Sequence, residues 1–206
     1  MKKEDTLPKR WLFVTMGIVL GMAMPRAEVI DRIVAVVDGT LITQSDVTAA
    51  IRLGLVYPPA AVVDRLIERL LMLKEVDRYA PPNPPDAVVD RTIAEIRDRA
   101  GSPAQFDAIL LQTGLGFDQV RRNVRDDLRI EAYLQQRFGA IQPTDVEMRE
   151  YYREHAAEFS QGGVLRPFEE AREVVKAALV AERRALTIRD WLADLRRRAN
   201  VNVLLR

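Results

Sequence analysis

The sequence predicts a mostly α-helical module whose two ends are joined by a small antiparallel sheet. Three patterns lead to this fold class. They are an Asp-Gly pair between two β-branched runs, a series of amphipathic segments punctuated by Pro and Gly, and an alternating apolar segment near the C-terminus. Of the 206 residues, 48% are hydrophobic and 30% are charged, which is the composition of a folded chain and not of a disordered one.

Residues 1–27 have the pattern of a secretory signal peptide. Four basic residues precede the 14-residue uncharged run at 11–24, and small residues lie near its end at Gly21, Ala23 and Ala27. A membrane span needs about 20 apolar residues, so this run is short for an anchor. We expect a cleavable signal over 1–27 and a single folded module over 28–206. An uncleaved inner-membrane anchor is the alternative.

Removal of the predicted signal peptide changes the charge balance. The whole chain has 31 basic and 30 acidic residues and a formal charge of +1. The leader holds five of the basic and two of the acidic residues, so 26 basic and 28 acidic residues remain, a net charge of −2. This near-neutral balance argues against a dedicated nucleic-acid binder.

Chemically active residues are scarce. The chain has no Cys, which excludes disulfide scaffolds, zinc–cysteine sites and thiol catalysis, and its one histidine, His155, excludes a multi-histidine metal site. No motif supplies His155 with a nucleophile or an orienting partner, so we interpret it as a surface or capping residue. Gly114 and Gly116 lack the further glycines and the strand of a phosphate loop. We expect no metal, no nucleotide and no other cofactor.

The folded part is predicted to begin with a hairpin. Residues 29–37 and 40–43 are β-branched runs, and Asp38-Gly39 between them suits a type I′ turn, which needs positive φ at both central residues. Two strands alone are marginally stable. Val201, Val203 and Leu205 alternate with Asn202 and Leu204, so residues 201–205 supply the natural third strand.

Helices fill the interval between these strands. A capping-box pattern at Thr43 and Asp46 opens a helix expected to reach about Val56, where Tyr57-Pro58-Pro59 ends it. A wide apolar stripe predicts a central helix at 60–79, and residues 81–85 read as a stiff extended joint. Further helices are predicted over 86–100, 103–113, 116–138, 143–158 and about 167–199, with residues 161–163 as a short flexible link. The apolar stripe of the last helix changes register near Glu182, so this helix packs on two surfaces or bends.

The charged clusters are interpreted as solvated, salt-bridged helix faces. The acidic pairs at 126–127 and 169–170 each have Arg neighbours, and adjacent helical residues point about 100° apart, so neither pair forms a two-carboxylate site. Acidic residues also intervene among the basic clusters at 121–122, 183–184 and 196–198. Contact of these arginines with anionic lipid headgroups or acidic partners is the alternative.

Six apolar and aromatic residues lie at predicted helix ends or joints. Such residues are most often part of the core, but a subset left exposed between long helices would form a hydrophobic cradle able to bind unfolded polypeptide. These candidate polypeptide-binding residues are Tyr57, Phe106, Leu115, Phe117, Tyr151 and Tyr152.

Several segments in the same order resemble one family, the SurA-type periplasmic chaperones. Residues 29–46 (VIDRIVAVVDGTLITQSD) look like the family's opening strand, turn, second strand and helix start, and residues 61–71 (AVVDRLIERLL) resemble its second helix. Residues 143–159 (PTDVEMREYYREHAAEF) resemble the stretch that leads into the family's isomerase domain. The stretch from PFEEAR at 167–172 to Leu205 is similar to its closing helix and strand.

The sequence departs from the family pattern at one place. The family carries parvulin-type prolyl isomerase domains between the segments that correspond to Phe159 and Pro167, where this chain has only seven residues. Seven residues cannot hold a domain of about a hundred. The resemblance therefore implies the chaperone module of 28–206 without the isomerase insert, and no catalytic residue of the family has a matching position here.

The resemblance implies an ATP-independent periplasmic chaperone that binds unfolded exported polypeptides, above all outer-membrane proteins. We expect no enzyme activity, no nucleic-acid partner and no nucleotide, and the sequence leaves the oligomeric state open. Two alternatives remain, a degenerate prolyl isomerase and a membrane-anchored envelope scaffold or accessory protein.

Overall fold

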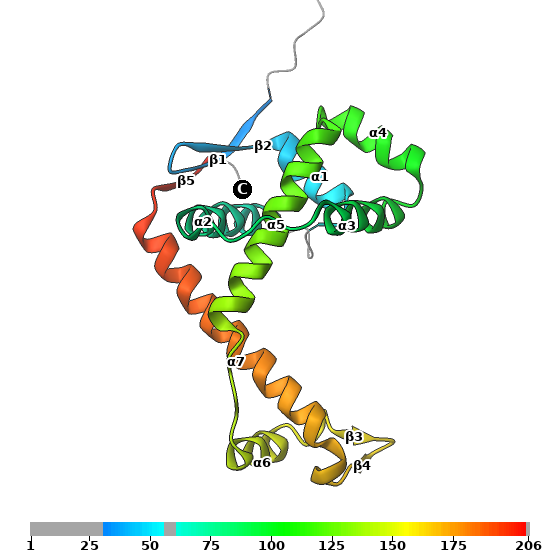
Figure 1. Ribbon diagram of the computed structural model, residues 1–206, viewed down its shortest axis with the longest axis vertical. Coiled ribbons are helices and arrows are strands. Elements are labelled where there is room, and N and C mark those ends of the chain that lie inside the picture. The colour runs from blue at the N-terminus through cyan, green and yellow to red at the C-terminus, as the bar shows by residue number, and fades with distance from the viewer. Residues whose placement is uncertain (1–30, 56–60, 205–206) are drawn as a thin grey trace, which may run out of the picture. The chain divides into compact units, whose positions relative to one another are not determined.

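The computed structural model describes residues 31–55 and 61–204, and in these ranges it contains seven helices and five strands. The mostly α-helical class and its small antiparallel sheet are as predicted (Figure 1). The predicted signal peptide lies outside the described residues. Among the helices described, none is both long and apolar enough to span a membrane. The elements in chain order are β1 (Ile33–Val37), β2 (Thr40–Thr43), α1 (Gln44–Arg52), α2 (Val62–Tyr79), α3 (Asp86–Arg99), α4 (Pro103–Thr113), α5 (Phe117–Phe138), α6 (Asp145–Glu154), β3 (Ser160–Gln161), β4 (Val164–Leu165), α7 (Phe168–Arg198) and β5 (Val201–Val203).

The sheet joins the beginning and the end of the described chain. Its strand order is β2-β1-β5, with both pairs antiparallel. Asp38 and Gly39 have φ values of 46° and 88°, so the β1–β2 connection has positive φ at both central residues, as a type I′ turn requires. The Asp38 N–H donates to the Asn200 carbonyl at 2.8 Å, and the Asn200 N–H donates to the Asp38 carboxylate at 2.6 Å. The predicted third strand is confirmed over Val201–Val203, Leu204 lies outside it, and Leu205 lies outside the described residues.

Helix α1 begins as predicted and ends earlier. Thr43 and Asp46 form a capping box, in which the Asp46 N–H donates to the Thr43 hydroxyl and the Thr43 N–H donates to the Asp46 carboxylate. The helix was expected to reach about Val56, but it ends at Arg52 because Gly54 takes a left-handed conformation with φ 63°. The Leu55 N–H then donates to the Ala50 carbonyl at 2.9 Å, which completes a Schellman end.

Helices α2 to α5 pack into two adjoining cores. Apolar residues of α2, including Ile67 and Leu71, pack with the sheet and with Leu195 of α7. Residues of α3, α4 and α5, with Leu53 after α1, form a second core around the fully buried Phe106. Helix α2 lies beside the sheet and contacts α5 (Figure 1). Residues 81–85 form neither helix nor strand, and Pro85 has the φ of −58° and ψ of 141° of an extended polyproline conformation.

The segment after α6 differs from the predicted flexible link. Helix α6 was expected to continue to 158 but ends at Glu154, where His155 caps it. Gly162 and Gly163 have φ values of 60° and 81° and form a two-residue turn between β3 and β4. The glycines supply the positive φ that this hairpin requires, so the link is an ordered hairpin.

Helix α7 packs on two different cores, as the change in its apolar stripe predicts. Its first half places Val175 and Leu179 against α6 and Phe159. Its second half places Leu195 against the sheet core, while Trp191 packs with α2 and α5. The helix runs from the β3–β4 hairpin to β5 (Figure 1).

Candidate functional site

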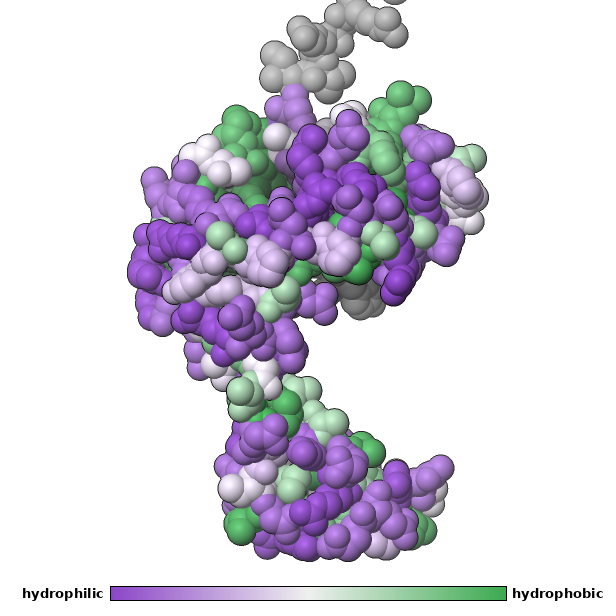
Figure 2. Space-filling model, viewed as in Figure 1, coloured by the Kyte–Doolittle hydropathy of each residue, from purple (hydrophilic) through white to green (hydrophobic). Residues whose placement is uncertain are grey.

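A cavity of about 610 Å³ lies among β2, α1, α2 and α5. Figure 2 shows apolar side chains around a hollow beside β1 and β2, on a face that is otherwise mostly hydrophilic. We call this space the α1–α2–α5 cavity. Among the described residues it is lined by Leu41, Ile42, Asp46, Ala49, Ala50, Leu53, Leu55, Arg65, Leu66, Arg69, Leu70, Leu115, Gln119, Asn123 and Asp127.

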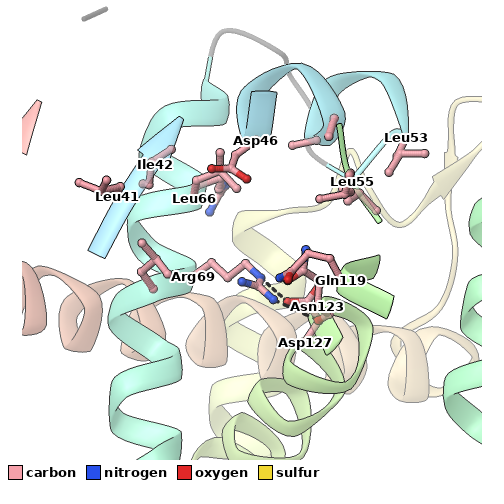
Figure 3. A pocket seen from close by; sticks show the side chains of 15 residues that line it. Leu41, Ile42, Asp46, Leu53, Leu55, Leu66, Arg69, Gln119, Asn123 and Asp127 are labelled. Carbon is pink, nitrogen blue, oxygen red and sulfur yellow. Dashed lines mark hydrogen bonds and ion pairs between the residues drawn. The ribbon is translucent and has the colours of Figure 1, made fainter. Parts of the chain in front are cut away.

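One wall of the cavity is apolar. In Figure 3, Leu41 of β2, Leu66 of α2 and Leu55 after α1 lie around its upper part. Leu41 and Leu55 are 50% and 45% exposed, so much of their apolar surface faces solvent. Leu66 and Leu70 are partly buried and pack against the sheet core. Removal of such surface from water is favourable by about 25 cal/mol per Å², so this wall can bind an apolar side chain.

The opposite side of the cavity is polar and is held by one arginine. Arg69 of α2 forms an ion pair with Asp127 of α5, and its Nη2 donates to the Asn123 carbonyl at 3.0 Å (Figure 3). The Gln119 amide donates to the Asn123 side chain at 3.1 Å. Arg69 thereby ties α2 to α5 at the base of the cavity.

Asp127 lies recessed at this polar side. Its side chain keeps 49% of its surface accessible to water, while protein atoms crowd its remaining sides. This desolvation raises the pKa of Asp127 above its ordinary value, and the neighbouring Arg69 opposes part of the rise. The cavity therefore offers apolar surface on one side and hydrogen-bonding groups on the other.

A space with these two sides fits a segment of polypeptide better than a small polar substrate. Apolar side chains of a bound segment would contact the leucines, and its backbone amides would find partners among Gln119, Asn123 and the ion pair. No group of three or more His, Asp or Glu side chains suited to a metal ion occurs in residues 31–55 and 61–204.

The six residues predicted to bind polypeptide do not form one site. Of the five that the structure describes, Leu115 alone lines the α1–α2–α5 cavity. Phe106 is 0% exposed at the centre of a core, and Phe117, 41% exposed, stacks on Arg97 with the guanidinium 5.2 Å from its ring centroid. Tyr151 is buried in the α6–α7 core, and Tyr57 lies outside the described residues.

Tyr152 lines a smaller groove on α6 and α7. This groove has a volume of about 420 Å³, and Val146 and Phe168 also contribute to it. The Tyr152 hydroxyl donates to the Arg166 carbonyl at 2.5 Å. Val146 is 74% exposed, so the groove adds a second patch of exposed apolar surface.

The remaining predicted groups have structural roles. The His155 ring stacks on Tyr151 at 4.0 Å between centroids, and its Nδ1 lies 3.0 Å from the Tyr151 carbonyl, so it caps α6 as predicted. The acidic and basic clusters form ion pairs across helices, as predicted for salt-bridged faces. These pairs include Asp127 with Arg69, Glu169 with Arg149, Arg121 with Asp86 and Asp90, Arg183 with Glu147, and Arg196 with Asp64.

Most of the cavity residues were not among those predicted to bind polypeptide. Leu41 lies in β2, Leu55 after α1 and Leu66 in α2. The sequence around each of them is typical of an ordinary core position. One feature of the sequence could have indicated these residues. The apolar stripe of α2 is too wide to face a single core. Part of that stripe, at Leu66 and Leu70, faces the cavity.

Comparisons with known proteins identify the fold. No family model matches the chain, and no curated protein matches it. Among solved structures, a chain aligns with it at a TM-score of 0.54 and 15% identity, over 84% of this chain and 99% of the other. That structure belongs to a study of the virulence factor PEB4 and the periplasmic protein Cj1289, described as two structurally related SurA-like chaperones of Campylobacter jejuni. The chain thus has the fold of a SurA-like chaperone.

Proposed function

We propose that the protein is an ATP-independent chaperone that binds unfolded exported polypeptides, outer-membrane proteins among them, in the α1–α2–α5 cavity. The observation that carries the proposal is the half-exposed leucine wall of this 610 Å³ cavity, set opposite a polar side. The likeness of the fold to SurA-like chaperones supports it.

The cavity suits reversible binding of modest affinity. Burial of one Leu or Phe side chain contributes about 1.5–3 kcal/mol, and the cavity has room for only a few such side chains. An unfolded client loses conformational entropy when a segment becomes ordered, which offsets part of this gain. Release then needs no nucleotide, because each contact is weak and exchange is fast.

We further propose that residues 1–27 direct export and are removed, so that the module of 28–206 acts in the periplasm. The apolar run at 11–24 and the preceding basic residues support this. N-terminal sequencing of the protein from the cell envelope tests it. A start near Met24 or Glu28 supports the proposal, and an intact N-terminus supports the anchored alternative.

The proposed activity is binding without catalysis. In the interval between Phe159 and Pro167, where the family resemblance would place an isomerase domain, the chain forms the short β3–β4 hairpin. An assay with a proline-containing tetrapeptide tests this part of the proposal. We expect the uncatalysed rate of isomerisation, and a faster rate would contradict it.

The direct functional test is suppression of aggregation. An outer-membrane protein diluted from urea scatters light as it aggregates, and the mature chain at stoichiometric amounts should slow this. The Leu41→Ser/Leu55→Ser double variant should need about tenfold more protein for the same effect, since loss of about 1.4 kcal/mol of contact energy weakens binding tenfold. Both side chains are about half exposed, so folding should persist.

Leu186→Ser is the matched control. Leu186 is 40% exposed on α7 and does not line the cavity. This variant should suppress aggregation as the wild type does. If the wild-type chain at stoichiometric amounts does not slow aggregation, the chaperone proposal is wrong. If Leu186→Ser loses as much activity as the double variant, the cavity is not the client-binding site.

A further inference from the structure

A second pocket, of about 540 Å³, lies where the last turns of α2, α5 and α7 meet. Its charged lining is unbalanced in favour of cations. Four arginines line it with only two carboxylates, and these residues are Arg78, Arg137, Arg197, Arg198, Glu75 and Asp194. We call it the arginine pocket.

The two carboxylates are already engaged. Glu75 accepts a hydrogen bond from Arg78 at 2.9 Å, and Asp194 forms an ion pair with Arg197. Within residues 31–55 and 61–204, neither Arg137 nor Arg198 has a carboxylate within ion-pair distance. The pocket therefore keeps an excess of positive charge.

Arg137 is held in place by aromatic rings and not by a counterion. Its guanidinium lies 5.4–5.9 Å from the ring centroids of Tyr133, Phe138 and Trp191. Its Nη1 donates to the Tyr133 hydroxyl at 3.0 Å. Burial raises the pKa of that hydroxyl, so it stays neutral and leaves the charge of Arg137 uncompensated.

Arginines often satisfy the carbonyls at helix C-termini, and that role accounts for only part of this pocket. The Arg198 Nε donates to the Asp194 carbonyl at 3.3 Å. Arg137 shows no such bond among the described residues; its hydrogen bond goes to a side-chain hydroxyl. A planar guanidinium, fixed by its neighbours and lacking a counterion, is prearranged to receive an anion.

We propose that the arginine pocket binds a phosphate group. Arg137 supplies the fixed cation, and Arg78 and Arg197 approach from the exposed rim, where their side chains are 70% and 72% accessible. The phosphate comes either from a free soluble anion or from the headgroup of an anionic lipid, because both present the same oxygens. This site is separate from the client cavity, so it does not depend on the proposed chaperone function.

Isothermal titration calorimetry with inorganic phosphate is the first test. Arg137→Gln should weaken binding about tenfold, because it removes the charge-assisted hydrogen bonds of the fixed guanidinium. Arg197→Gln should weaken it about threefold, because exposed ion contacts contribute less. The fluorescence of Trp191, the one Trp of residues 28–206, should change on titration of this mature chain because the ring lines the pocket.

Arg91→Gln is the matched control, since Arg91 is exposed on α3 and does not line the pocket. It should bind phosphate as the wild type does. The Leu41→Ser/Leu55→Ser variant should also bind phosphate normally, which separates failure of this proposal from failure of the chaperone proposal.

Vesicles identify the source of the phosphate. A lipid headgroup is the source if the protein co-sediments with vesicles that contain phosphatidylglycerol and not with vesicles of phosphatidylcholine alone. This co-sedimentation should be lost in Arg137→Gln and Arg197→Gln. Calorimetric binding without co-sedimentation assigns a soluble anion. The proposal is overturned if neither probe binds, or if both arginine variants bind as Arg91→Gln does. Arg197→Gln keeps the test decisive if Arg137→Gln fails to fold.

Discussion

Glu147 links helices α6 and α7 through a single side chain. Its carboxylate accepts hydrogen bonds from the Thr144 N–H at 2.7 Å and from Arg183 of α7 at 2.7 Å. It therefore closes the capping box of α6 and fixes that helix to α7. The hydrogen bond from Arg183, followed by those from Thr144, lowers the pKa of Glu147 from 4.5 to about 2.

This pKa gives a prediction for stability against pH. Because the folded pKa lies below the unfolded one, the stabilisation is complete above pH about 4.5 and disappears as the pH falls towards about 2. Glu147→Gln should lower the urea midpoint of unfolding at pH 7, and the difference from wild type should shrink through this acid range. Glu150→Gln, an exposed change on the same helix, should show little difference at either pH. A gap that stays constant down to pH 2 would contradict the assignment.

At the residue scale, the sequence predicted local chemistry well and exposure poorly. The Asp38-Gly39 turn and the Thr43–Asp46 capping box depend on neighbours within a few residues, so their patterns are visible in the sequence. The exposure of an apolar side chain depends on distant elements. For that reason Phe106 was proposed as a binding residue and is buried, whereas the half-exposed Leu41 was not proposed.

At the scale of elements, β5 joins the C-terminal end of α7 to the sheet. Asn202 lies opposite Val36, and alternate residues of an antiparallel strand turn their N–H groups towards the partner. The Leu204 N–H donates to the Val34 carbonyl of β1, and the Asn200 carbonyl accepts from the Asp38 N–H just after β1. The Asn202 N–H therefore also faces β1, and that of Val203 faces away.

Proline substitution separates these two positions. Asn202→Pro removes a ladder hydrogen bond and leaves a β1 carbonyl without its donor, so it should lower the free energy of unfolding by about 2–3 kcal/mol. Val203→Pro should lower it by less than about 1 kcal/mol, because its N–H lies on the open edge. Chemical denaturation of the two variants measures the difference. Equal destabilisation would show that the register is wrong.

The elements themselves were largely predictable. Their order follows from hydrophobic period and from Pro and Gly punctuation, and the helix at 103–113 agrees with α4 at both ends. Two of the errors came from glycine. Gly54 ends α1 early, and Gly162-Gly163 turns a hairpin where a flexible link was expected. In each case the glycine supplies a positive φ, and sequence alone does not distinguish that role from a linker.

At the scale of the whole described chain, function depends on elements far apart in sequence. The cavity needs β2, α1, α2 and α5, and Arg69 must reach Asp127, which lies 58 residues later. No local pattern encodes that meeting, so the apolar residues at helix ends predicted a cradle without locating it. The candidate residues from the aromatic positions were consequently spread over three separate regions.

Site-specific photo-crosslinking is the sharpest test of client binding in the α1–α2–α5 cavity. A photoreactive side chain placed at Leu55, on the cavity wall, or at Leu186, on the exposed face of α7, is irradiated with an unfolded outer-membrane protein present. If clients bind in the cavity, they should crosslink efficiently from Leu55 and little from Leu186, and the Leu55 crosslink should be lost once the client has folded. Equal crosslinking from the two positions, or crosslinking from Leu186 alone, would contradict it.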